Sequence, residues 1–250
     1  MKIEQLTVNI GAQVDGVQLS SIDESTFEAI QEGLWKHQVL VFRDQKLSRE
    51  EHLSFGRRFG ELHKHPALVG KCEHPEELII KNRGKSKTVT EVWHSDVSCD
   101  PRPPSLSILR AVEVPEFGGD TLWASQYAAF ESLSSGLRQF LSPLKALHEN
   151  YDMSSAHPVV RVHPETGRQA LYVNGGFTKH FEGMTHNESE PLLNYLVQTG
   201  SALDISMRHR WRQNDVVIWD NRCLLHYAVH DHADNPRVIN RLQVIGGVPK

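Results

Sequence analysis

The chain has 250 residues, a hydrophobic fraction of 39%, a charged fraction of 23% and a formal net charge of −4, which together suit one globular domain over residues 1–250. This balance argues against nucleic acid as a partner, and no stretch approaches the roughly 18 apolar residues that cross a membrane. The three cysteines are scattered and the N-terminus has no long apolar run, so we expect a cytoplasmic protein without a signal peptide or disulfide framework.

The first sixty residues predict a mixture of strands and helices. Strands are expected at residues 3–10 and 39–42, and helices at residues 24–37 and 49–59. Asp23 is a suitable N-cap for the first helix, because its carboxylate can accept a hydrogen bond from a free backbone N–H. Ser48 and Glu51 have the spacing of a capping box, which places the start of the second helix.

Residues 91–99, with the sequence EVWHSDVSC, form a β-favouring run that carries His94 and Asp96. On a strand, residues two apart point to the same face. The pair is therefore a natural two-ligand unit for an iron site built from two histidines and one carboxylate, which needs three ligands on one side of the metal. The sequence predicts that these residues form a strand and that His94 and Asp96 bind a metal.

The spacing alone is weak evidence, because similar pairs recur in a chain with 15 histidines. The other pairs are His74/Glu76, His163/Glu165, His186/Glu188 and His232/Asp234. Two of them enclose a proline, one falls in the first turn of a predicted helix and one runs into an Asn-Pro loop signal. His94 and Asp96 are therefore the preferred pair.

The second half of the chain predicts short strands with a few helices. The expected elements are a helical zone at residues 126–144, a hairpin at 157–173 with its turn at 165–167, a helix from a capping box at 185–188 to about 197, and strands at 205–211, 215–220 and 237–247. Alternating strand–helix units are absent from this pattern. We therefore expect a mainly β protein, a sandwich or barrel with a helical flank.

A third metal ligand must come from a part of the chain that is remote in sequence. His226 follows the apolar strand predicted at residues 215–220 and is the first candidate. His230 and His232 are its neighbours, and the spacing does not separate the three.

Two arginines on the last predicted strand suggest an anion-binding interior. Arg237 and Arg241 lie four residues apart and would share one face, separated by about 13 Å at about 3.3 Å per residue. If that face points inward, each guanidinium is costly without an anionic partner, and its geometry suits a carboxylate or sulfonate. The alternative is that both face solvent or pair with the acids of the chain itself.

Taken together, these segments resemble the taurine and 2,4-dichlorophenoxyacetate dioxygenase family of Fe(II)- and 2-oxoglutarate-dependent oxygenases. The resemblance extends from residues 11–19 to 242–248. Its most specific parts are the sequences WHSDVSCDPRPPSLSILRAVEVPEFGGDTLWAS, WDNRCLLHYAV and RVINR. The resemblance implies a double-stranded β-helix (jelly-roll) core of the clavaminate-synthase type.

The resemblance also implies a role for individual residues. His94, Asp96 and His226 match the catalytic residues that ligate Fe(II). Thr121 and Arg237 match the positions that hold the distal carboxylate of 2-oxoglutarate. The positions that contact the primary substrate are Arg241, His65 and Val97.

The implied reaction consumes O2 and 2-oxoglutarate, releases succinate and CO2, and hydroxylates a small anionic substrate. Halogenating relatives lack the carboxylate ligand, so Asp96 favours hydroxylation over chlorination. Thr90 and Leu68 stand where taurine-specific members carry Asn and Tyr, so we expect another acid: a sulfonate, a sulfate ester, an aryloxyalkanoate or an amino-acid derivative. Relatives also suggest a homodimer or homotetramer, and residues 81–90 are a candidate lid.

Two other functions compete with this interpretation. One is a non-catalytic jelly-roll protein that binds small acids, and the other is a zinc hydrolase with water as the fourth ligand. A pure binder has no need for an open-faced metal triad, and a zinc hydrolase has no evident use for the GGDTLW block or the paired arginines. Most of the four tryptophans near the motifs, Trp93, Trp123, Trp211 and Trp219, are interpreted as core packing, with cavity lining as the alternative. Cys99 and Cys223 are interpreted as small buried apolar residues.

Overall fold

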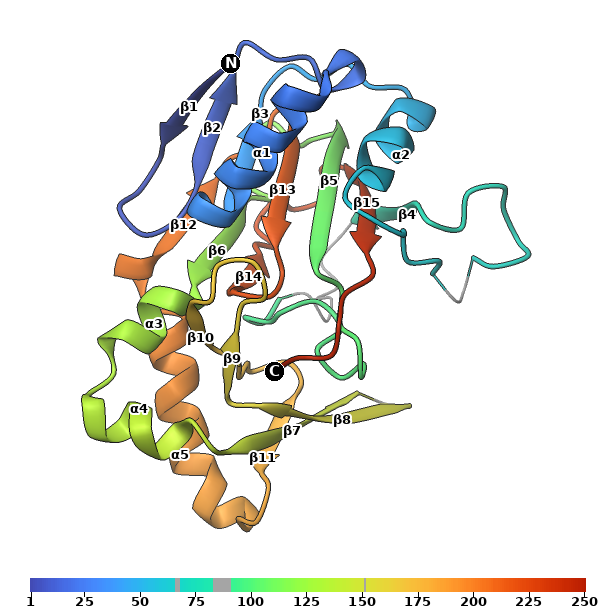
Figure 1. Cartoon of the computed structure of the whole chain (residues 1–250). Helices are drawn as coiled ribbons and strands as arrows, with labels where there is room; N and C mark the ends of the chain where they lie inside the picture. Colours follow the sequence, from blue (N-terminus) through green and yellow to red (C-terminus); the bar gives the residue numbers. More distant parts are fainter. Residues whose placement is uncertain (66–67, 83–90, 151) are drawn as a thin grey trace.

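The computed structural model describes residues 1–65, 68–82, 91–150 and 152–250, and within these residues seven strands form a main sheet (Figure 1). In their spatial order the strands are β1 (Lys2–Gln5), β2 (Ala12–Asp15), β3 (Val39–Phe42), β13 (Val216–Asp220), β5 (Leu106–Glu113), β15 (Arg237–Val244) and β4 (Leu78–Asn82). Only β2 and β3 pair in parallel; the other neighbours are antiparallel. Strands remote in sequence therefore lie side by side.

A second sheet packs against one face of the main sheet. Its strands are β12 (Ser206–His209), β6 (Thr121–Ser125) and β14 (Leu224–Ala228). The apolar layer between the two sheets contains Trp123 and Leu224 from the second sheet, and Trp219 and Ile239 from the main sheet. The mainly β sandwich expected from the sequence is therefore present, and Trp123, Trp211 and Trp219 pack in its core as predicted, whereas Trp93 is half-buried against Tyr227.

Two helices cover the other face of the main sheet. These are α1 (Glu24–His37) and α2 (Arg49–Arg57), which lie in front of the sheet in Figure 1. Leu40 and Phe42 of β3 pack in the layer beneath the helices, whereas Val39 and Val41 face the second sheet. All four residues are apolar because both faces of this strand are covered. The capping interactions predicted at Asp23 and Ser48 are present.

The remaining elements form a flank around a separate apolar core, in the lower part of Figure 1. They are α3 (Gln126–Ser132), α4 (Ser135–Leu141), α5 (His186–Gly200), β7 (Lys145–Asn150), β8 (Met153–Pro158), β9 (Val160–Val162), β10 (Gln169–Leu171) and β11 (Thr178–Phe181), with short 3-10 turns at η1 (Leu19–Ser21) and η2 (Leu203–Ile205). Strands β11, β7 and β8 form a three-stranded sheet, called the flank sheet below. Among the described residues, no helix combines the length and apolar character needed to span a membrane.

Several boundaries differ from those predicted, and four of the differences have a structural explanation or bear on the site. The strand expected at residues 3–10 ends at Gln5, because Thr7 Oγ1 both donates to Ile10 O and accepts from Ile10 N, which closes a bend. The helical zone at 126–144 is two helices, since Ser134 caps the start of α4. The hairpin is β9–β10, and the residues before 159 belong to β8. The candidate lid begins two residues too early because Lys81 and Asn82 belong to β4; residues 83–90 lie outside the described residues.

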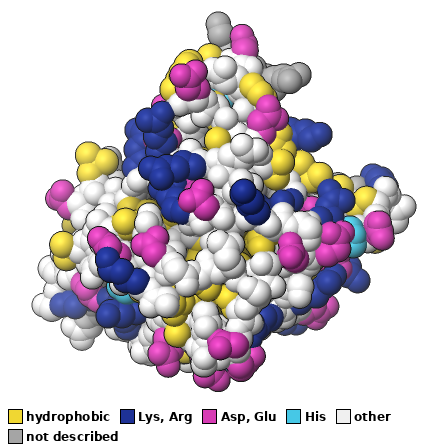
Figure 2. All heavy atoms as spheres, turned by 90° about the horizontal axis from the view of Figure 1, so that it is seen from above, with side chains coloured by type: hydrophobic (Ala, Val, Ile, Leu, Met, Phe, Trp, Pro, Cys, Tyr) yellow, Lys and Arg dark blue, Asp and Glu magenta, His cyan; other side chains and the backbone are white. Residues whose placement is uncertain are grey.

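Charged side chains are mixed on the face drawn in Figure 2. Lysine and arginine lie among aspartate and glutamate there, with hydrophobic side chains in small groups between them. This distribution is in line with the net charge of −4.

A buried polar network joins the flank sheet to the segment that follows residue 96. Ser98 Oγ lies 3.0 Å from His148 Nδ1 and accepts a hydrogen bond from Asn174 Nδ2, also at 3.0 Å. His157 Nε2 donates to the carbonyl of Asp100 at 3.0 Å. Burial, together with the neighbouring His157, lowers the pKa of His148 to about 3, so this imidazole is neutral in the folded protein at ordinary pH.

Replacing His148 with Asn should therefore weaken the pH dependence of stability. In the unfolded chain the imidazole takes up a proton below about pH 6.5, whereas the folded protein resists this until about pH 3. Lowering the pH from 7 to 5 should thus cost the wild type about 2 kcal/mol more folding free energy than the variant. Urea unfolding at both pH values measures the difference. Exposed His186 provides the control, and an equal change in His186→Asn would contradict the assignment.

Candidate active site

The main-chain pairing of His94 with His226 is the centre of the site. His94 N donates to His226 O at 3.1 Å, and His226 N donates to His94 O at 2.8 Å. This is an isolated antiparallel bridge, so the strand predicted at residues 91–99 is wrong. The chain leaves the extended conformation because Val97 has φ +47° and opens a turn closed by Asp100 N and Val97 O.

This pairing brings the predicted ligands together despite the missing strand. Asp96 Oδ1 lies 3.9 Å from His94 Nε2 and 3.8 Å from His226 Nε2, and all three side chains are buried. The structure thus gathers His226 with His94 and Asp96. The neighbouring histidines lie elsewhere, His230 beside Glu91 and His232 against the carbonyl of Asn235.

The protonation states of the three side chains suit a metal. Burial, reinforced by His94, lowers the pKa of His226 to about 3, so its ring nitrogen is free to donate a lone pair. Burial alone would raise the pKa of Asp96, but the nearby charge of Arg241, with the hydrogen bond from Ser107, outweighs it and holds that pKa well below its usual range. Two neutral imidazoles and one ionised carboxylate are the donor set of the non-haem Fe(II) oxygenases, so the residues fit this metal.

Asn221 fixes the main chain of Asp96. Its Oδ1 accepts from Asp96 N at 2.8 Å, and its Nδ2 donates to Asp96 O at 3.0 Å and to Pro104 O at 2.9 Å. Asn221 lies in the turn between β13 and β14. The residues that Asn221 joins are remote in the chain, so no local pattern could indicate this contact.

The turn itself is held by a buried ion pair. Asp220 accepts from Arg222 Nη2 at 2.6 Å and Nε at 2.9 Å, and from His163 Nε2 at 2.9 Å. His163, Asp220 and Cys223 form a second cluster of metal-ligand types in the described part of the chain. However, Arg222 already compensates Asp220, and burial raises the pKa of the Cys223 thiol, which therefore stays protonated. Cys223 is a buried small residue, as the sequence predicted.

Arg237 is a buried cation whose partners are uncharged. Within the described residues it donates to Gly119 O at 3.0 Å, Asn82 Oδ1 at 3.3 Å and Thr121 Oγ1 at 3.4 Å. Burial lowers its pKa to about 10, so it remains charged at neutral pH. A buried charge held only by neutral groups is costly, and an anionic ligand resolves that cost.

Thr121 is prepared to donate a hydrogen bond at the same place. Its Oγ1 accepts from Trp211 Nε1 at 2.9 Å as well as from Arg237. A hydroxyl oxygen has two lone pairs and one hydrogen, so the hydrogen of Thr121 remains available for a ligand oxygen. The absence of a side chain at Gly119 makes room for the Arg237 side chain, since a Cβ at residue 119 would lie 3.1 Å from Arg237 Cδ.

Arg241 lies next to the proposed metal ligands. Its Nη1 donates to Asp96 Oδ1 at 3.1 Å, whereas its Nε is buried and has no hydrogen-bond partner in the described part of the chain. Burial, with Arg241 as the next cause, lowers the pKa of His65, which places His65 within the electrostatic reach of this arginine. Val97 directly follows Asp96 in a left-handed conformation, which is strained for a β-branched residue.

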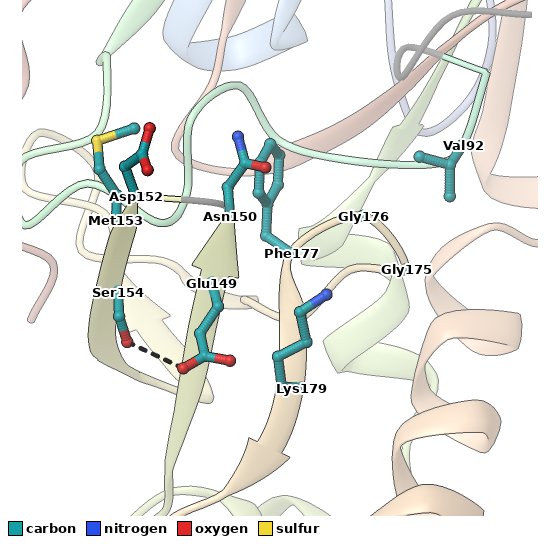
Figure 3. A pocket seen from close by; sticks show the side chains of 10 residues that line it. All are labelled: Val92, Glu149, Asn150, Asp152, Met153, Ser154, Gly175, Gly176, Phe177 and Lys179. Atoms are coloured by element: carbon teal, nitrogen blue, oxygen red, sulfur yellow. Dashed lines mark hydrogen bonds between the residues drawn. The ribbon is translucent and has the colours of Figure 1, made fainter.

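A cavity of about 980 Å3 lies between Val92, Phe177 and residues of the flank sheet (Figure 3). Val92 lines one side and its carbonyl accepts from His94 Nδ1 at 2.7 Å. Phe177 also lines the cavity, with its ring centroid 6.1 Å from that of His94. Ser154 and Lys179 belong to the flank sheet, which forms the outer wall. His94, Asp96 and His226 do not line the cavity, and Val92 and Phe177 are the lining residues that contact or approach His94.

The sequence and structure were compared with those of known proteins. Residues 2–243 match the family model described as "Taurine catabolism dioxygenase TauD, TfdA family". The chain is 36% identical to an alkylsulfatase of Acinetobacter baylyi over 99% of this chain and 86% of that protein. It is 34% identical to an alpha-ketoglutarate-dependent sulfate ester dioxygenase of Pseudomonas putida, over 100% and 91%. The crystal structure of a taurine dioxygenase from Burkholderia xenovorans superposes with a TM-score of 0.92 at 36% identity, over 99% and 92%.

The chain therefore belongs to the TauD/TfdA family and is an Fe(II)- and 2-oxoglutarate-dependent dioxygenase. The jelly-roll fold expected from the resemblance is confirmed by the structural match. Family membership favours this enzyme class over the zinc hydrolase and the non-catalytic binder.

The buried Asp220–Arg222 ion pair, in the turn that precedes β14, gives a test of how the site is stabilised. Asp220→Asn should destabilise the protein by about 3–5 kcal/mol, because Arg222 is left buried without its counter-ion. Glu131→Gln breaks the exposed pair with Arg168 and should cost less than about 1 kcal/mol. Urea unfolding of both variants measures the contrast. Similar losses in the two variants would mean that burial does not govern the Asp220–Arg222 interaction.

Proposed function

We propose that this dioxygenase oxidises an organic sulfate ester or sulfonate, with His94, Asp96 and His226 as its Fe(II) ligands. The observation that carries the ligand assignment is the convergence of Asp96 Oδ1 with two imidazole Nε2 atoms at 3.8–3.9 Å. When bound, iron and 2-oxoglutarate supply the oxidising chemistry, while the protein supplies position and charge.

Arg237 and Thr121 would bind the distal carboxylate of 2-oxoglutarate. Arg237 provides a buried positive charge without an acidic partner, and Thr121 provides a hydroxyl hydrogen beside it. A carboxylate at this point would receive a charge-assisted hydrogen bond from each residue. This assignment accounts for a buried charge whose hydrogen-bond partners among the described residues are all neutral, with Asp120 acting on it only through its electric field.

Arg241 would bind the anionic group of the substrate. Its buried, unpartnered Nε can donate to a sulfate or sulfonate oxygen, while Nη1 remains near Asp96. We propose that His65 and Val97 contact the same anion. The charge of Arg241 helps to lower the pKa of His65, and Val97 stands in a strained turn directly after Asp96. An anchored anion fixes which C–H bond lies near the metal.

The organic part of the substrate would occupy the cavity beside Phe177. Its volume of about 980 Å3 is at the upper end of the range for small-molecule sites, which favours an extended alkyl or aryl group over a two-carbon acid. In a sulfate ester, one oxygen atom of O2 would enter the C–H bond next to the ester oxygen. The hydroxylated carbon then loses hydrogen sulfate to leave an aldehyde, and the second oxygen atom appears in succinate.

Three further proposals concern the whole protein. The cysteines are free among the described residues, which supports a reducing, cytoplasmic location. Residues 1–250 would act as one domain. The chain would form a homodimer or homotetramer, which light scattering of the purified protein measures.

Removing the carboxylate ligand tests the proposed metal site. Asp96→Ala should abolish succinate formation from 2-oxoglutarate, because two imidazoles alone hold the metal weakly and in no fixed orientation. Under anaerobic conditions, Fe(II) and 2-oxoglutarate should give a weak visible absorption band with the wild type and none with the variant. Exposed Asp204 provides the control variant Asp204→Ala. Full succinate release by Asp96→Ala would refute the ligand assignment.

The cavity predicts a preference for long substrates. Succinate release should be screened against alkyl sulfates and sulfonates of increasing length, with aryloxyalkanoates and N-acylated amino acids as other acids. Ser154→Phe narrows the outer cavity and should lower kcat/KM about tenfold or more for long chains, because each buried methylene contributes about 0.8 kcal/mol. Short chains should be unaffected, as should all substrates in the exposed control Ser135→Phe. An equal loss for short and long chains would place the substrate elsewhere.

A further inference from the structure

The two carboxylate oxygens of Asp96 have different surroundings. Oδ1 faces both imidazoles and Arg241. Oδ2 accepts a hydrogen bond from Ser107 Oγ at 2.7 Å. Ser107 is fully buried, at 0% exposure, so solvent does not replace this contact.

Ser107 reaches the site from the main sheet. It lies on β5 two residues before Leu109, which packs between the two sheets, so its side chain points into the same layer. Gln243 is its cross-strand neighbour on β15, and Gln243 Nε2 donates to Ser107 Oγ at 3.4 Å. A carboxylate can only accept. The single hydroxyl hydrogen of Ser107 therefore points to Asp96 Oδ2, in the direction that Gln243 favours.

Because Asn221 holds the main chain of Asp96, only the side-chain torsion angles of Asp96 can change. Since Asn221 bonds the N–H and carbonyl of this residue, its main chain is fixed. Without a partner on Oδ2, the carboxylate could rotate and present both oxygens to a metal. A carboxylate can bind metals through one oxygen or through two, and the second mode uses an additional coordination position.

We propose that Ser107 is a positioning residue that holds Asp96 as a one-oxygen ligand, and that Gln243 acts through Ser107. The hydrogen bond to Oδ2 directs Oδ1 alone toward the histidines. A bound metal would then keep its remaining coordination positions for 2-oxoglutarate and O2. This inference rests on the proposed function of His94, Asp96 and His226 as metal ligands. It assigns a role to two residues that no sequence spacing connects with the metal.

The test measures metal binding without turnover. Calorimetry with Mn(II) and anaerobic protein should show Ser107→Ala binding about 10–100-fold more weakly than the wild type, the usual effect of losing a hydrogen bond to a metal ligand. Ser107→Thr retains the hydroxyl and should restore the affinity to within about threefold of the wild type. The visible spectrum of the Co(II) form should change in Ser107→Ala, because the carboxylate gains a second binding mode.

Ser125→Ala is the matched control. Ser125 is also buried on a strand, and its hydroxyl donates to Gln38 Oε1 at 2.7 Å, away from the metal ligands. It also caps α3, so a general loss of stability should be at least as large in this variant, with metal affinity unchanged. If Ser125→Ala weakens Mn(II) binding as much as Ser107→Ala, or if Ser107→Ala binds Mn(II) like the wild type with the same Co(II) spectrum, the proposal is overturned.

A double substitution tests the path through Gln243. Gln243→Leu should weaken Mn(II) binding less than Ser107→Ala, and the double variant should be no weaker than Ser107→Ala alone, since both changes remove one interaction. If the losses of Mn(II) affinity in the two single variants add up in the double variant, Gln243 does not act through Ser107. Failure of the wild type to bind any Mn(II) would instead reject the proposed metal site, so the two failures are distinguishable.

Discussion

The pair of main-chain hydrogen bonds between His94 and His226 is the constraint on which the site depends. It joins a short irregular segment to β14, which the second sheet already holds in place. Because the pairing is antiparallel and in register, both imidazoles emerge on the same side. Asn221 then secures Asp96 from the adjacent turn. Two distant segments thus bring the three proposed metal ligands together without a continuous strand beneath them.

Burying charged side chains around these residues costs folding free energy. Arg237 and Asp96 are buried, and buried charges destabilise a fold unless they are paired or bound to a ligand. The two apolar layers on either face of the main sheet offset this cost. Asp220 and Arg222 are paired with each other and serve structure, whereas among the described residues the hydrogen-bond partners of Arg237 are uncharged. That difference supports the proposal that Arg237 binds an anion.

The fold divides the work between its parts. The main sheet and the second sheet supply Arg237, Arg241, Thr121 and His226 from regular strands, whose positions the sandwich fixes. The flank sheet, built around a separate apolar core, supplies the outer wall of the cavity. In the proposed function, binding of the anionic group is thereby separated from recognition of the rest of the substrate. The His148 network connects the two parts, so the cavity wall keeps its place relative to the metal ligands.

The sequence by itself determined the capped helices, the alternating buried strands and the residue types of the site, because those features depend on neighbours a few positions away. Local patterns selected His94 and Asp96 but left His226 undivided from two nearby histidines, and only the family resemblance singled out His226. The tertiary structure placed His226 against Asp96, reduced the expected strand to a single bridge at His94 and brought Ser107 to Asp96. These outcomes depend on register between strands distant in the chain, and register is set by packing of whole sheets. No local pattern contains that information.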